Sequence, residues 1–195
     1  MKYISFTGAQ STGKTTLIKK CMDTLPHSDW EFVPEVTRLV KRNHCVDINE
    51  LGNDDTQILI LAQHLSNANC SYDRDLKGVI MDRCIIDGLV YTNYLYSENK
   101  VSPDVAHHSE YMFNKLLPKL DLVFYTSPKD IPLEDDGERS INIAFRDGIL
   151  NEFEDILYYI DSQYDDVPEV IRLEGTVEER LDIIMKALKY EDTVR

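Results

Sequence analysis

The sequence feature that most constrains this chain is the run Gly-Ala-Gln-Ser-Thr-Gly-Lys-Thr at residues 8–15. It follows β-branched and aromatic residues at 2–7, which predict a strand, and it precedes a helical pattern at 16–23. Gly8 and Gly13 can adopt backbone angles closed to other residues, so consecutive N–H groups can turn inward around an anion. The helix that begins here directs its positive dipole end at the same point. This stretch therefore predicts binding of a nucleoside triphosphate.

The spacing G-x-x-x-x-G-K-T is the Walker A pattern, which assigns a role to each part of the loop. We expect the Lys14 ammonium to reach the β- and γ-phosphates and the Thr15 hydroxyl to hold a magnesium ion (Mg2+). We also expect Lys14 to lie in a solvent-facing loop and to contribute little to a core. The residues expected to bind ATP are Gly8, Ala9, Gln10, Ser11, Thr12, Gly13, Lys14, Thr15 and Thr16.

Length and composition narrow the class of protein. The 195 residues, 43% of them hydrophobic, suit one ordinary core, so we expect a single domain over residues 1–195. A formal charge of -14 disfavours extended nucleic acid as a partner. No apolar run is long enough to span a membrane, and the four cysteines form no C-x-x-C pair. The expectation is a cytoplasmic protein with small-molecule partners, whose oligomeric state is open.

Hydrophobic patterning predicts strands that alternate with helices along the chain. The further strand patterns lie at 30–33, 78–82, 121–126 and 170–173, and the further helical patterns begin near residues 34, 53, 103, 149 and 177. Residues 85–91 fit either a hairpin around Asp87-Gly88 or a helix, and the alternating order favours the helix. These patterns predict one α/β domain with a five-stranded, mostly parallel sheet and a ligand at the carboxyl ends of its strands.

Two of these helices carry further expectations. Pro34 suits the first turn of the helix that continues through Arg42. The 53–55 stretch suits a helix cap, and Ile58, Leu59, Leu61, Ala62 and Leu65 predict one broad apolar face on the long helix that follows.

Three candidate functional features lie at strand ends. Asp82 closes an apolar strand and is typical of the Walker B carboxylate that holds magnesium directly or through water. Arg83 beside it is equally compatible with a surface position and with binding of substrate or phosphate. Glu35 and Arg38 follow the second strand one helical turn apart, so they share a face. They predict either two side chains that point into one pocket or a surface ion pair, which spacing alone slightly favours.

A fourth candidate lies in the polar segment 127–140, which contains two prolines, an acidic run and Gly137. Its composition indicates a loop. Arg139 in such a glycine-containing loop can close over a triphosphate and neutralise charge in the transition state.

The motifs taken together resemble one family. Residues 7–16, Pro-Glu-Val-Thr-Arg at 34–38, Asp-Arg at 82–83 and Asp-Asp-Gly-x-Arg-Ser at 135–140 resemble the NadR-like P-loop ATPase/kinase family, which contains ribosylnicotinamide-kinase-like, AAA-type ATPase domains. The resemblance covers nearly the whole chain in the same order, and the 135–140 motif is its most particular part. It implies the three-layer P-loop fold of nucleoside and nucleotide kinases, ATP held at 8–16, Asp82 on the metal side and Arg139 in a lid.

The function expected from these features is transfer of the ATP γ-phosphoryl group to a nucleoside-type small molecule, either nicotinamide riboside or a (deoxy)nucleoside. The expected catalytic residues are Lys14, Glu35, Asp82 and Arg139, with Glu35, Arg38 and Arg83 facing the acceptor and Thr15 and Asp82 facing the metal. Two alternatives stay open. One is a thymidylate-like nucleoside monophosphate kinase with Arg83 on the acceptor phosphate, and the other is a slow ATPase that acts as a regulatory switch.

Overall fold

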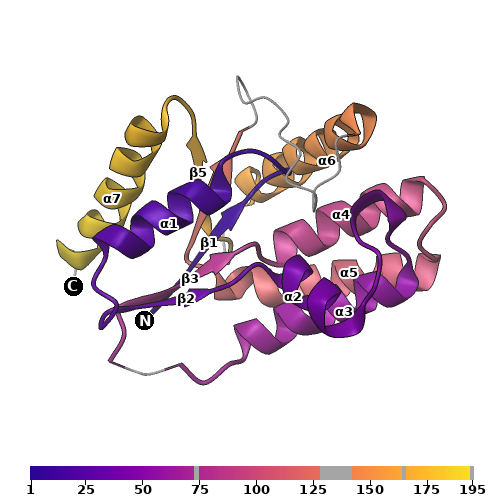
Figure 1. Cartoon of the computed structure of the whole chain (residues 1–195), viewed down its shortest axis with the longest axis horizontal. Coiled ribbons are helices and arrows are strands. Elements are labelled where there is room, and N and C mark those ends of the chain that lie inside the picture. The colour runs from indigo at the N-terminus through magenta and orange to yellow at the C-terminus, as the bar shows by residue number, and fades with distance from the viewer. Residues whose placement is uncertain (73–74, 128–141, 164–165, 194–195) are drawn as a thin grey trace.

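The computed structural model describes residues 1–72, 75–127, 142–163 and 166–193, and its centre is a five-stranded sheet (Figure 1). All four pairs of neighbouring strands are parallel, in the order β2-β3-β1-β4-β5. The strands are β1 (Lys2–Thr7), β2 (Trp30–Val33), β3 (Gly78–Asp82), β4 (Leu122–Thr126) and β5 (Glu169–Leu173). This is the expected α/β architecture, and every strand lies where the hydrophobic patterning predicts it.

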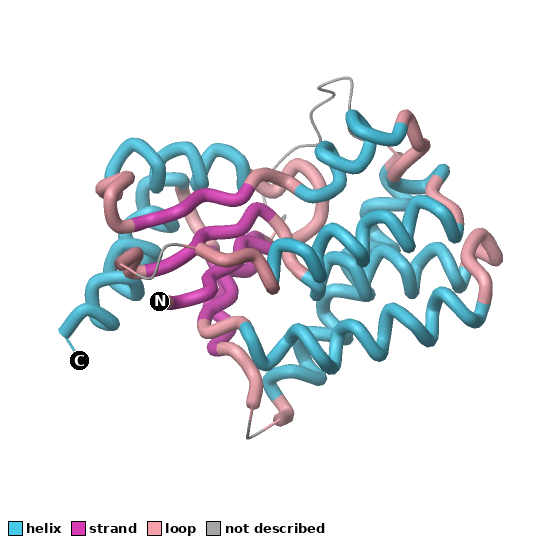
Figure 2. The backbone as a smooth tube through the Cα atoms, turned by 90° about the horizontal axis from the view of Figure 1, so that it is seen from below, coloured by secondary structure: helices cyan, strands magenta, loops and turns pink. Residues whose placement is uncertain are grey.

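Helices cover both faces of the sheet and make a three-layer molecule. On one face lie α1 (Lys14–Thr24) and α7 (Val177–Thr193). The other layer contains α2 (Val36–His44), α3 (Asp54–Ala68), α4 (Ile85–Ser97), α5 (Pro103–Leu116) and α6 (Ile143–Asp161). Figure 2 shows the long helices of this second layer running beside the strands. Short 3-10 helices occupy Asn49–Leu51 and Leu117–Lys119. Within the described residues, no helix is long and apolar enough to cross a membrane.

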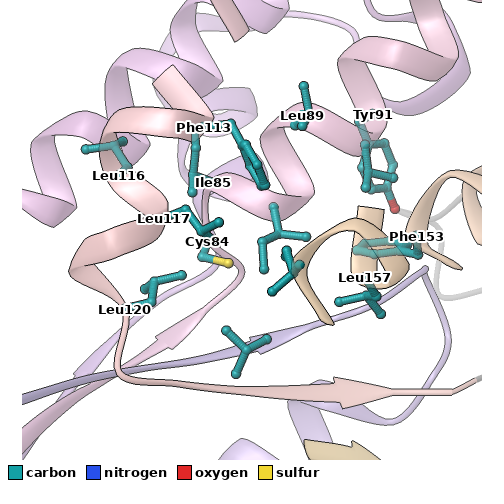
Figure 3. Packing of buried hydrophobic residues seen from close by; sticks show 14 of the residues in the cluster. Cys84, Ile85, Leu89, Tyr91, Phe113, Leu116, Leu117, Leu120, Phe153 and Leu157 are labelled. Atoms are coloured by element: carbon teal, nitrogen blue, oxygen red, sulfur yellow. The ribbon is translucent and has the colours of Figure 1, made fainter. Parts of the chain in front are cut away.

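Each face of the sheet has its own core because successive strand residues point to opposite faces. Phe6 and Phe124 pack against α1 and α7, whereas Val123 and Tyr125 pack against the second layer. The second core is the larger, and Figure 3 shows its aromatic and aliphatic side chains interleaving between α4, α5 and α6. No disulfide links these layers, since all four cysteines are free thiols, and Cys21 and Cys84 pack within the two cores.

Two expectations about helices are corrected. Pro34 lies before the helix it was expected to start, because α2 begins at Val36 and Glu35 is its N-cap residue. On α3, Ile58 and Leu65 are exposed, whereas Gln57 and His64 are buried. The buried face of α3 meets α2, α4 and α5, and the contacts available there override the apolar pattern. By contrast, Asn53 caps α3 as expected, and residues 85–91 form the start of α4.

The topology places the carboxyl ends of three strands together. β1 lies between β3 and β4, and the chain leaves β1 and β3 in opposite directions across the sheet: β1 is followed by β2 at one edge, and β3 is followed by β4 on the other side of β1. Phe6 of β1 is in register with Asp82 on one side and Phe124 on the other, so Asp82 lies beside the start of residues 8–15. Such a switch point is where open α/β sheets hold their ligands.

Candidate active site

The loop at residues 8–15 has the backbone shape that an anion nest requires. Gly8 has a φ of 136°, and a Cβ there would lie 2.7 Å from the Thr126 carbonyl oxygen, so no other residue fits. Gly13, with a φ of 84°, is the N-cap residue of α1. The Thr12 and Thr126 hydroxyls are 2.6 Å apart, and Thr12 Oγ1 also donates to the Ala9 carbonyl. The loop is therefore fixed against the end of β4 before any ligand arrives.

Contrary to the expectation from the sequence, Lys14 does not face solvent. Its side chain is buried, with 6% of the residue exposed, and Nζ donates to the carbonyl oxygens of Gly8 at 2.7 Å and Ala9 at 2.6 Å. Burial, assisted by the nearby Arg83 guanidinium, lowers the pKa of Lys14 to about 7. A phosphate group at the loop would supply the missing counter-charge and offer this ammonium stronger acceptors than two carbonyls.

Asp82 and Thr15 face one small cavity together with the loop. Asp82 Oδ1 is buried and has no hydrogen-bond partner among the described residues. Burial, followed by repulsion from Glu35, raises the pKa of Asp82 to about 6. Carboxylate and hydroxyl oxygens are ligands that magnesium prefers, and magnesium usually binds one or two carboxylates together with phosphate oxygens and water. The chemistry of these two side chains therefore fits the expected metal.

An ion-pair network crosses the floor of the site, and Arg83 is its centre. Its Nε donates to Glu35 Oε1 at 2.9 Å and its Nη1 to Asp87 Oδ1 at 2.8 Å. Arg38 Nε contacts the other Glu35 oxygen at 2.7 Å. Asp87 is held in turn by the Thr7 hydroxyl at 2.7 Å. The network ties β1, β3 and the start of α2 and α4 into one unit.

Of the two positions that the sequence allows for Arg83, the structure shows the buried one. The residue is 8% exposed, its backbone has a φ of 74°, and its guanidinium lies 5.3 Å from the centre of the Tyr91 ring. Burial disfavours the charged guanidinium, but Tyr91, Glu35 and Asp87 outweigh burial and raise its pKa. A left-handed backbone at a non-glycine residue costs on the order of 1 kcal/mol or more and is concentrated at functional sites.

Glu35 and Arg38 form the expected ion pair, but the Glu35 side chain is only 15% exposed, and both residues line a cavity. Burial alone would raise the pKa of Glu35, but Arg83 and then Arg38 outweigh burial and lower it. Glu35 is therefore an ionised carboxylate at neutral pH. It faces both the small phosphate-side cavity and a larger neighbouring one.

The larger cavity has a volume of about 620 Å3, which is in the range of small-molecule sites. It adjoins the loop at Gln10 and extends along one face of α2. Its wall is made by Gln10, Pro34, Glu35, Thr37, Arg38, Leu39, Lys41, Arg42, Cys45, Ile48, Asn49 and Arg83. An acceptor in this cavity would lie beside a triphosphate held by the loop.

Sequence reasoning missed several residues that shape the site. The sequence pattern placed Asp87 only in a helix and did not identify it as the partner of Arg83. Its position at the start of α4, four residues after Arg83, could have indicated this ion pair. Arg180 of α7 is 4% exposed and donates to the carbonyls of Thr12 at 3.2 Å and Gly175 at 2.9 Å. No local pattern marks Arg180, because the contact crosses almost the whole chain. Arg139, the expected lid residue, lies outside the described residues.

Comparisons with known proteins agree with this geometry. A family model described as an AAA domain matches residues 3–180. A thymidylate kinase from Psychrobacter sp. (strain PRwf-1) is 25% identical over 210 residues, covering 97% of this chain and 98% of its own length.

Two solved structures show the same fold. The structure of deoxyadenosine kinase from M. mycoides, with dCMP and dCDP bound, has a TM-score of 0.68 and 18% identity over 96% of this chain and 99% of that one. The structure of NadR in complex with NAD and AMP-PNP has a TM-score of 0.69 and 18% identity, covering all of this chain (100%) and 50% of the NadR chain. The sheet order, the loop geometry and the match over residues 3–180 lead to one conclusion: the chain belongs to the AAA domain family of P-loop proteins.

Proposed function

We propose that this protein is a P-loop kinase that transfers the γ-phosphoryl group of ATP to a hydroxyl of a nucleoside-type acceptor, either nicotinamide riboside or a (deoxy)nucleoside. The observation that carries the proposal is the position of Glu35, an ionised carboxylate on the wall shared by the phosphate-side cavity and the larger cavity. The similarity to thymidylate kinase, deoxyadenosine kinase and NadR supports the same class of reaction.

On the phosphate side, the backbone N–H groups of residues 8–15 hold the triphosphate, and Lys14 moves from the Gly8 and Ala9 carbonyls to the β- and γ-phosphate oxygens. Thr15 and Asp82 would hold magnesium, which neutralises charge on the β- and γ-phosphates when bound. Arg139 is assigned to the γ-phosphate on its sequence motif alone. Positioning and charge neutralisation supply most of the catalysis in such a site.

On the acceptor side, Glu35 takes the proton of the acceptor hydroxyl while the hydroxyl oxygen forms a bond to the γ-phosphorus. The bond between that phosphorus and the bridging oxygen breaks, and ADP leaves with the electron pair. Arg83 and Arg38 hold the Glu35 carboxylate from two sides, so its position is fixed before the acceptor binds. A carboxylate here suits a hydroxyl, which needs a base, better than it suits an acceptor phosphate, which it would repel.

The second candidate is a nucleoside monophosphate kinase. The match to a thymidylate kinase along nearly the full length of both chains favours it, as does Arg83 on the cavity wall. In that case Arg83 would have to exchange one of its two carboxylates for the acceptor phosphate.

A screen that detects products separates the candidates. Purified protein with Mg-ATP is offered nucleosides, nicotinamide riboside and nucleoside monophosphates, and phosphorylated products are identified by mass. We expect products from the hydroxyl acceptors. Products from monophosphates alone would replace the proposal with the second candidate. ADP formation that no acceptor stimulates would indicate the slow ATPase instead.

A further inference from the structure

We propose that the acceptor carries a carboxylate at the end remote from its reacting hydroxyl, and that Lys41 and Arg42 of α2 bind it. This inference deepens the proposed function and rests on it. It comes from the distribution of charge along the 620 Å3 cavity, whose wall contains four cations and one carboxylate in a protein of net charge -14.

The charges nearest the phosphate-side cavity are already balanced. Arg83 and Arg38 are matched there by Glu35 and Asp87, with all three contacts at 2.9 Å or less. An anionic group of the acceptor would gain little here, because it would compete with Glu35 for the same two guanidinium groups. The reacting end of the cavity therefore favours the uncharged end of an acceptor.

The opposite end of the cavity carries charge that is not balanced. Lys41 and Arg42 line the wall at exposed positions, and neither side chain makes an ion pair or hydrogen bond with any residue that the structure describes. The dipole of α2 favours cations in its last turn, which also contains His44. However, the dipole acts on all three residues, whereas Lys41 and Arg42 are the two that line the cavity. A ligand anion is the partner that this end of the wall lacks.

The spacing matches an acceptor of nucleoside length. Glu35, Arg38 and Arg42 follow one another at helical intervals on one face of α2, so Arg42 lies about 10 Å beyond Glu35 along the axis. A ribosyl hydroxyl at Glu35 then places the far edge of the base ring near Arg42. The planar fork of Arg42 suits a carboxylate on that ring, and Lys41 adds a second donor.

The test uses two ligand pairs that differ mainly in a carboxylate on the ring edge away from the ribose: nicotinic acid riboside against nicotinamide riboside, and 5-carboxyuridine against uridine. Calorimetry measures binding of each to protein loaded with AMP-PNP and magnesium, so the result does not depend on turnover. We expect at least one acid to bind roughly tenfold or more tightly than its neutral partner, with a preference that weakens as salt rises.

Variants assign that preference to the two residues. In the double variant Lys41→Gln, Arg42→Gln, the ratio between acid and neutral affinities should fall close to one. Lys115→Gln removes one positive charge from an exposed site on α5, away from this cavity, and should keep the wild-type ratio. Equal binding within both pairs, tighter binding of the neutral members, absence of binding by both acids, or a preference that survives the double variant would each overturn the inference.

The product screen keeps this result separate from the proposed function. If neutral nucleosides are phosphorylated but neither acid is preferred in binding, the kinase proposal stands and the carboxylate inference fails. If an acid binds through Lys41 and Arg42 but no acceptor is phosphorylated, the inference stands as a binding site and the kinase proposal fails.

Discussion

The phosphate end of the site and its acceptor end are built from different parts of the chain. The phosphate end is formed by consecutive residues, 8–15, whose backbone atoms provide most of the ligand contacts we propose. The acceptor end is formed by side chains of α2, of the turn after β3 and of the loop before α3. A nest of backbone groups accepts any triphosphate, whereas a wall of side chains can discriminate between acceptors. The two ends should therefore respond differently to substitution and to pH.

The largest expected effect is at the phosphate end. Lys14→Ala removes the cation that we assign to the β- and γ-phosphates and should lower phosphoryl transfer by roughly a thousandfold or more. The fold should persist, because Lys14 is a buried cation whose lowered pKa shows that burial disfavours its charge. Activity and circular dichroism are measured together, with Lys19→Ala on the exposed side of α1 as the control. An active Lys14→Ala protein would refute the assignment of the whole loop.

At the acceptor end, Glu35→Gln should lower kcat by roughly a hundredfold, the usual range for a lost general base. The acceptor KM should change much less, because the amide has the same shape and Asp87 still holds Arg83. Steady-state kinetics on the best acceptor provide the measurement, and Glu31→Gln on the exposed side of β2 is the matched control.

The same variant also decides between the two candidate functions. For a monophosphate acceptor, Glu35→Gln should be mild and Arg83→Ala should raise the acceptor KM. A near-normal kcat in Glu35→Gln with a hydroxyl acceptor would remove Glu35 from the mechanism.

The third prediction concerns pH and His64, which shares a small cavity with Thr37 and Arg83 of the acceptor end. His64 of α3 is 5% exposed, and burial lowers its pKa from 6.5 to about 4. The unfolded chain binds a proton at His64 below pH 6.5 while the folded protein does not, so stability falls as the pH drops from 6.5 toward 4. Between pH 6.5 and 5 the contribution is about 2 kcal/mol.

Urea denaturation at pH 7 and pH 5 measures this effect. The drop in unfolding free energy should be smaller in His64→Gln than in the wild type by about that amount. His108→Gln, at an exposed position on α5, should retain the wild-type drop. Equal drops in His64→Gln and the wild type would show that His64 titrates normally in the folded protein.

The smallest effect is expected at the contact between Arg180 of α7 and the loop at residues 8–15. Arg180 holds the Thr12 carbonyl from behind, which leaves the loop N–H groups free to face a ligand. Arg180→Ala should raise the KM for ATP about tenfold with a smaller change in kcat, since a hydrogen bond from a charged donor is worth on the order of 1.5 kcal/mol. Arg180→Lys should recover part of the loss, and Lys186→Ala on the same helix should have no effect. An unchanged KM in Arg180→Ala would limit Arg180 to packing.

The sequence supported different depths of prediction at the two ends. The pattern at 8–15 located the loop and its flanking strand and helix, because all of its constraints act between near neighbours. Lys14 was nevertheless placed in solvent, since the carbonyls that hold it and the neighbours that bury it come from the folded loop. At the acceptor end, Glu35, Arg38 and Arg83 were identified as candidates, but their pairing was not, because Arg83 is 48 residues from Glu35 in the chain.

The sequence by itself determined the local parts of this protein: five strands, the order of helices between them and a phosphate loop with its glycines. These depend on backbone conformation and on periodicity, which a few adjacent residues specify. Only the tertiary structure decided which charges meet. Glu35 meets Arg83 because β2 pairs with β3, and Arg180 meets Thr12 because α7 packs near α1. It also decided that Lys41 and Arg42 share a cavity wall with Glu35. Electrostatic interactions depend on distance and burial in three dimensions, and spacing along the chain does not encode either.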